Sequence, residues 1–172
     1  MTRHAHDMDD LLPTSIAGLS LHPLVVHATV VLVPMASVVV LLAAVLPRFR
    51  RWAGVLPVLL ALGALVLTPV ATGSGENLQR QLAARGVTNP LVPEHAELGE
   101  LLIWWVVPLF VVALATYVVA RRDRRSGTGP VAPRWATVGL AVLGVVVPLG
   151  AIVQVVLIGH SGAEAVWGYL AS

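Results

Sequence analysis

The 172-residue chain contains no cysteine and no lysine, and only 12% of its residues are charged. The missing cysteine excludes disulfides, cysteine-ligated metal clusters and thiol redox chemistry. The low charge argues against a soluble domain, in which about a quarter of the residues are charged. Phosphate-binding loops, dinucleotide fingerprints and nucleophile–base motifs are also missing. The sequence therefore gives no basis for a hydrolase or a transferase, and a redox role stays open.

Apolar residues are abundant instead and make up 57% of the chain. They form four charge-free stretches at residues 25–46, 53–72, 101–120 and 136–158. Each has about the 20 residues that a helix needs to cross a membrane. The sequence predicts an all-α fold, a four-helix transmembrane bundle with up-down-up-down topology over residues 21–172. A polar tail, residues 1–20, precedes this bundle. The expected location is the cell membrane, with the lipid bilayer as the surroundings.

All 11 basic residues are arginine, and eight of them fall in the first and third connections between the stretches. These eight are Arg48, Arg50, Arg51, Arg121, Arg122, Arg124, Arg125 and Arg134. The positive-inside rule makes both connections cytoplasmic and places both termini on the outer side. Because these arginines would face anionic headgroups, we predict no nucleic-acid partner. We call this side of the bundle the arginine end.

Imidazoles and carboxylates gather at the opposite side, which we call the histidine end. The depth of a side chain in the membrane follows from its distance along the helix from the arginine end, at 1.5 Å per residue. This estimate places one side chain of each helix at nearly the same level, namely His22, Glu76, His95 and His160. His27 lies roughly 7 Å deeper. Imidazole and carboxylate groups suit zinc, copper or iron, and imidazoles inside an apolar bundle suit haem b. We predict a metal site of His22, His27, Glu76, His95 and His160, or a haem held by His27, His95 and His160.

His27 is the most informative of these residues because it begins the apolar core, where ionisable groups are costly and usually functional. We therefore predict that His27→Ala abolishes cofactor retention. In a continuous helix His22 and His27 lie ~140° apart, so both can face one site only if the helix breaks near Pro23. Otherwise His22 caps the helix.

Gln154 is predicted to form a hydrogen bond across the bundle. The two predicted hairpins have a similar shape but no shared motif.

The stretch from His22 to His27 reads H-P-L-V-V-H, and Thr72-Gly73 with Glu76 follows the second span. His95 enters the third span, and Gly159-His160 ends the fourth. This pattern resembles an uncharacterised bacterial family of four-helix membrane proteins whose first helix opens with H-P-x-x-V-H. The family is distantly similar to small haem-b membrane cytochromes, and that resemblance favours haem as the cofactor. Thr29 departs from the pattern, which often has proline there.

Three functions follow as hypotheses. The first is electron transfer at the outer face through a haem b or a transition metal ion, with a redox partner protein. The second is a small proton-coupled transporter or channel that uses His27 and Gln154. The third is a structural or sensory subunit without a cofactor. A conducting path normally needs polar groups further across the membrane, and few are present, which argues against transport. The sequence leaves homo-oligomerisation open.

Overall fold

The computed structural model describes residues 15–16, 19–86, 89–127 and 132–167. Helices make up most of this part of the chain: α1 Leu21–Val45, α2 Pro47–Ala53, α3 Leu56–Ala84, α4 Leu91–Leu101, α5 Ile103–Ser126 and α6 Arg134–Trp167. Two short strands, β1 Ser15–Ile16 and β2 Leu19–Ser20, pair antiparallel before α1.

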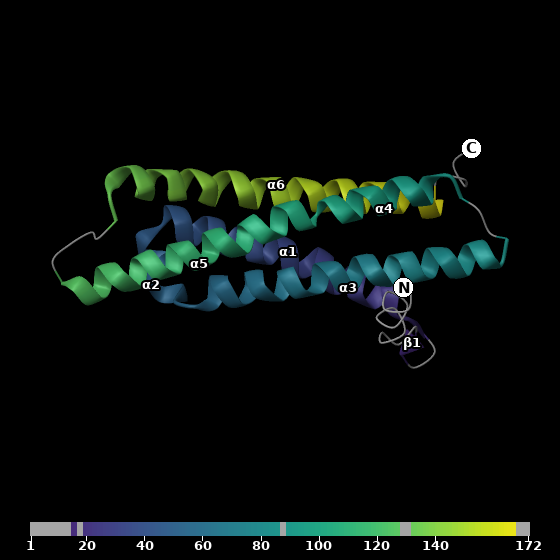
Figure 1. Cartoon of the computed structure of the whole chain (residues 1–172), viewed down its shortest axis with the longest axis horizontal. Coiled ribbons are helices and arrows are strands. Elements are labelled where there is room, and N and C mark those ends of the chain that lie inside the picture. Colours follow the sequence, from purple (N-terminus) through teal and green to yellow (C-terminus); the bar gives the residue numbers. More distant parts are fainter. Residues whose placement is uncertain (1–14, 17–18, 87–88, 128–131, 168–172) are drawn as a thin grey trace, which may run out of the picture.

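Four long rods lie side by side and alternate in direction, as Figure 1 shows. They are α1, α3, the combined length of α4 and α5, and α6. Each is long and apolar enough to cross a membrane. The structure therefore confirms the predicted all-α fold with four spans. The short α2 joins the first two rods at the arginine end and stops at Gly54, whose φ of 57° favours glycine.

Helix α3 is longer than predicted. The sequence predicts that Gly73-Ser74-Gly75 ends this helix and that residues 74–94 form a long loop, with 76–85 as an optional helical piece within it. In the structure α3 continues without a break to Ala84. Two glycines cost a helix only about 1 kcal/mol each, and good helix formers such as Leu78, Gln79 and Gln81 follow them. The last residues of the predicted loop, from Leu91 on, belong to α4. As a result, the histidine end has mainly helical walls.

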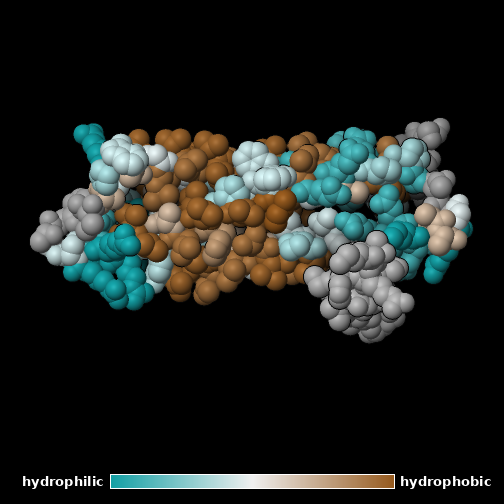
Figure 2. Space-filling view, in the orientation of Figure 1, coloured by the Kyte–Doolittle hydropathy of each residue, from teal (hydrophilic) through white to brown (hydrophobic). Residues whose placement is uncertain are grey.

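Large apolar side chains are exposed along the middle of the bundle. Figure 2 shows them as a broad hydrophobic belt between two hydrophilic ends. Val31, Leu59, Val111 and Val153 are each more than half exposed. An apolar surface of this extent suits contact with lipid tails. Exposed Trp52 and Trp135 lie near the arginine end, where tryptophan is favoured at a membrane–water interface.

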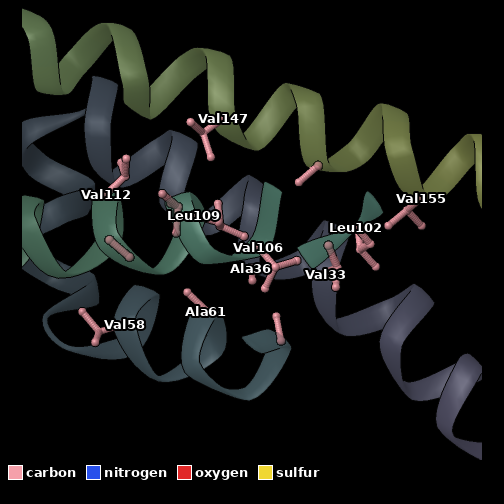
Figure 3. Close-up of a cluster of buried hydrophobic side chains, with 14 residues drawn as sticks. Val33, Ala36, Val58, Ala61, Leu102, Val106, Leu109, Val112, Val147 and Val155 are labelled. Carbon is pink, nitrogen blue, oxygen red and sulfur yellow. The ribbon is translucent and has the colours of Figure 1, made fainter. Parts of the chain in front are cut away.

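The core between the helices is built mainly from small and β-branched residues (Figure 3). Val33 and Ala36 of α1, Ala61 of α3, Val106 of α5 and Ala151 of α6 are fully buried. Because lipid tails are as apolar as these side chains, close packing rather than water exclusion holds such helices together. Small residues let the backbones of the four spans approach each other closely.

The predicted orientation can be tested directly, because a chain without cysteine allows labelling of single introduced cysteines. We expect a membrane-impermeant maleimide to label Ala83→Cys, at the histidine end of α3, in intact cells. Ser126→Cys, at the arginine end of α5, should react only after the cells are permeabilised. Labelling of Ser126→Cys alone in intact cells would show the reverse orientation.

Candidate functional site

A cavity of about 460 Å³ lies inside the histidine end of the bundle. Helices α1, α3, α4 and α6 all contribute to its walls. Its volume falls within the range of small-molecule and cofactor pockets, roughly 300–1,000 Å³. Two histidines, His22 at the start of α1 and His95 in α4, line the cavity. They are close enough to interact electrostatically.

His22 is held by a hydroxyl of the neighbouring helix α3. Its Nδ1 lies 3.1 Å from Oγ of Ser74. That hydroxyl already donates its only proton to the carbonyl of Ala71, at 2.8 Å. With that proton on the Ala71 carbonyl, Ser74 Oγ is left to accept from His22, and this assigns the proton of the neutral imidazole to Nδ1. The lone pair is then on Nε2, the nitrogen that can bind a ligand.

His95 is held in the same way by α6. Its Nδ1 lies 3.0 Å from Oγ of Ser161, and that hydroxyl donates to the carbonyl of Ile158 at 3.0 Å. The same reasoning places the His95 proton on Nδ1 and the lone pair on Nε2. Metal-binding histidines are commonly oriented by such a hydrogen bond from the nitrogen that does not bind the metal. Both rings are thus in the form that a metal requires.

Two glycines make room for these rings. A Cβ atom at Gly75 would lie 3.0 Å from Cε1 of His22, and a Cβ atom at Gly162 would lie 3.0 Å from Cε1 of His95. Contacts this short are tighter than real Cβ atoms tolerate without a shift of the neighbour. Glycine at each position therefore allows the Cε1 atom of an imidazole to come close to the adjacent helix.

The remaining lining is largely apolar. Thr29 and Thr68 are buried, and their hydroxyls bond the carbonyls of Val25 and Ala64 in their own helices. Such bonds use the only proton of each hydroxyl, so neither threonine is left with a proton to donate to a ligand. Two exposed carboxylates, Glu76 and Glu100, are the acidic residues of the lining. The cavity therefore offers two imidazoles in mainly apolar walls, with negative charge where it meets solvent.

Gln154 fixes α4, which carries His95, to α6. Its Nε2 donates to the carbonyl of Leu98 at 2.7 Å. The N–H of Leu102 bonds Gly99 rather than Leu98, which leaves the Leu98 carbonyl for Gln154 where α4 gives way to α5. The predicted hydrogen bond of Gln154 across the bundle is thereby confirmed.

The five residues predicted as ligands do not form one group. His22, Glu76 and His95 line the cavity, but His27 and His160 do not. His27 is exposed, and its Nδ1 bonds the Pro23 carbonyl at 2.6 Å. His160 is also exposed and lies 3.3 Å from Glu164, one turn further along α6.

The physical reason concerns the first helix. Helix α1 is continuous through Pro23, so His22 and His27 face different directions. In the part of the chain that the structure describes, no three histidines, aspartates or glutamates are placed to hold a metal ion. Sequence reasoning also missed Ser74, Gly75, Ser161 and Gly162. The available signal was a Ser-Gly pair near the end of both the second and the fourth span.

Four membrane-spanning helices with a cavity at one end define a multi-pass integral membrane protein. Residues 18–171 match the model of a family described as "Predicted membrane protein (DUF2231)". The chain belongs to this family, in agreement with the resemblance that its motifs indicate. No curated protein and no solved structure matches the chain.

Proposed function

We propose that this membrane protein binds a b-type haem in the cavity at the histidine end, where His22 and His95 would hold its iron. The observation that carries the proposal is the matched state of the two imidazoles. Each Nδ1 lies 3.0 or 3.1 Å from a serine oxygen that itself donates to a backbone carbonyl, which assigns the imidazole proton to Nδ1 and the lone pair to Nε2. Bis-histidine ligation requires this pair of nitrogens.

The walls of the cavity favour a haem over a bare metal ion. A structural zinc site usually has four protein ligands and a catalytic one three, whereas no three histidines, aspartates or glutamates of the described residues are placed to hold an ion. The apolar side chains Val26, Leu102, Val155 and Ile158 suit the faces and edges of a porphyrin. A bound haem would supply one-electron chemistry.

The chain's own residues would bind and orient the group and keep water from it. Ser74 and Ser161 would accept hydrogen bonds from the Nδ1–H groups, which orients the imidazoles as ligands. Glu76 and Glu100 put negative charge at the cavity opening, where it would favour a positively charged reaction partner. The proposed role is therefore electron exchange at the histidine end of the membrane.

Purification without chelators from haem-replete cells tests this proposal. We expect about one haem per chain, with the absorption and electron paramagnetic resonance spectra of low-spin bis-imidazole iron. Apo-protein in detergent should regain the same spectra when titrated with hemin. Stoichiometric metal without porphyrin would replace haem by an ion site. Protein that holds neither, before and after the titration, would remove both kinds of cofactor.

A further inference from the structure

The surroundings of His22 and His95 agree contact by contact. In each case a histidine near the start of one membrane-spanning segment contacts a Ser-Gly pair in the next segment. The Nδ1···Oγ distances are 3.1 and 3.0 Å, and the serine-to-carbonyl distances are 2.8 and 3.0 Å. Both serines donate to the carbonyl three residues earlier in the chain. Both glycines that follow the serines lie against Cε1 of the histidine.

The agreement extends along the cavity walls. Residues at equal separations from Ser74 and Ser161 line the cavity in both halves; three such pairs are Thr68 with Val155, Ala71 with Ile158, and Gln79 with Val166. The paired residues differ in type, so the correspondence is one of position. It explains why the sequence alone shows no shared motif beyond Ser-Gly.

The packing of the helices follows the same relation. Within the halves, α1 packs on α3, and α4 and α5 pack on α6. Between the halves, α1 packs on α6 and α5 packs on α3. A rotation that exchanges the halves turns each of these contacts into another one. This neighbour pattern is consistent with an approximate twofold relation between the halves, in which His22 and His95 are equivalent residues.

We infer that the chain consists of two equivalent halves that each supply half of the ligand site, and that Ser74 and Ser161 are its positioning residues. Each serine holds one imidazole with its proton on Nδ1 and its Nε2 lone pair available. The binding of haem iron by these lone pairs rests on the proposed function. The assigned proton positions are independent of that function, because they follow from hydrogen bonds within the chain.

Nitrogen-15 NMR of the cofactor-free protein, labelled on histidine, measures the proton positions. At pH 8 an ordinary imidazole is neutral, since its pKa is about 6.5. We expect His22 and His95 to carry the proton on Nδ1. Ser74→Ala should change only the His22 signals, and Ser161→Ala only those of His95. Ser74→Thr and Ser161→Thr, which keep a hydroxyl, should restore the native pattern.

The unaffected histidine in each variant shows whether the bundle is still folded. Hemin affinity is then measured on the same proteins. We expect each Ser→Ala variant to lose affinity by roughly 10–100-fold, as is typical when a ligand's outer hydrogen bond is removed, and the two losses to be similar. A proton on Nε2 of His22 or His95 in the native protein would overturn this inference. If the protons are on Nδ1 but hemin does not bind, the inference on the positioning serines stands and the proposed haem binding is refuted.

Discussion

His22→Ala and His95→Ala proteins should each be purified without haem. Each substitution removes one of the two proposed ligands, and among the residues that the structure describes the mainly apolar lining offers no other imidazole to replace it. Loss of an outer hydrogen bond alone commonly costs 10–100-fold in metal affinity, so loss of the ligand itself should cost more than about 100-fold. Absorbance of the Soret band per chain, and a hemin titration of each apo-protein, measure this effect.

His27→Ala and His160→Ala are the matched controls. Both native side chains are exposed and lie outside the cavity. We expect both proteins to keep full haem occupancy. For His27 this differs from the prediction made from the sequence, in which His27→Ala abolishes cofactor retention. Loss of haem from His27→Ala together with its retention by His22→Ala would show that α1 presents the other histidine to the cofactor.

Gly144→Ala should strongly destabilise the bundle. A Cβ atom at Gly144 would overlap the Cβ atom of Ala44 where α6 crosses α1. Ala44 has no flexible side chain that could move aside, so the helices themselves must separate. Overpacking of this kind typically costs about 1–3 kcal/mol. Unfolding in mixed micelles, with helix content followed by circular dichroism, gives the change in the free energy of unfolding.

Gly139→Ala controls for the intrinsic effect of alanine in the same helix. A Cβ atom at Gly139 would meet no other atom within 4 Å. Alanine is the better helix former by about 1 kcal/mol, so this variant should be as stable as the native protein or more so. Equal stabilities of the Gly144→Ala and Gly139→Ala proteins would contradict the close approach of α6 to α1.

Much of the fold could be predicted from the sequence because four charge-free stretches of membrane length allow few other structures. The ends of the helices were harder to predict. Gly73 and Gly75 look like helix terminators, yet α3 continues through them. At Gly75 the glycine makes room for the ring of His22 instead. A glycine that breaks a helix and one that admits a neighbour cannot be told apart without knowing the neighbour.

The depth of the site residues in the membrane could be predicted from the sequence, but the direction in which each side chain points could not. Counting residues placed His22, Glu76 and His95 at a similar level, and all three line one cavity. The same count could not show that α1 turns His27 away, because this depends on whether Pro23 breaks the helix. The hydroxyls of Ser74 and Ser161 went unnoticed, since serine is common in membrane helices and its partner lies 52 or 66 residues away.

The placement of both cavity-lining histidines at one end of the bundle bears on the membrane voltage. Moving one elementary charge across the whole membrane changes its energy by about 2.3 kcal/mol per 100 mV. A redox group at the middle of the bilayer would feel about half of this, so its reduction would become harder or easier as the cell polarises. The proposed haem between His22 and His95 would lie near the edge of this field, because His22 begins the first membrane-spanning segment. Its midpoint potential should therefore stay almost constant while the membrane charges and discharges.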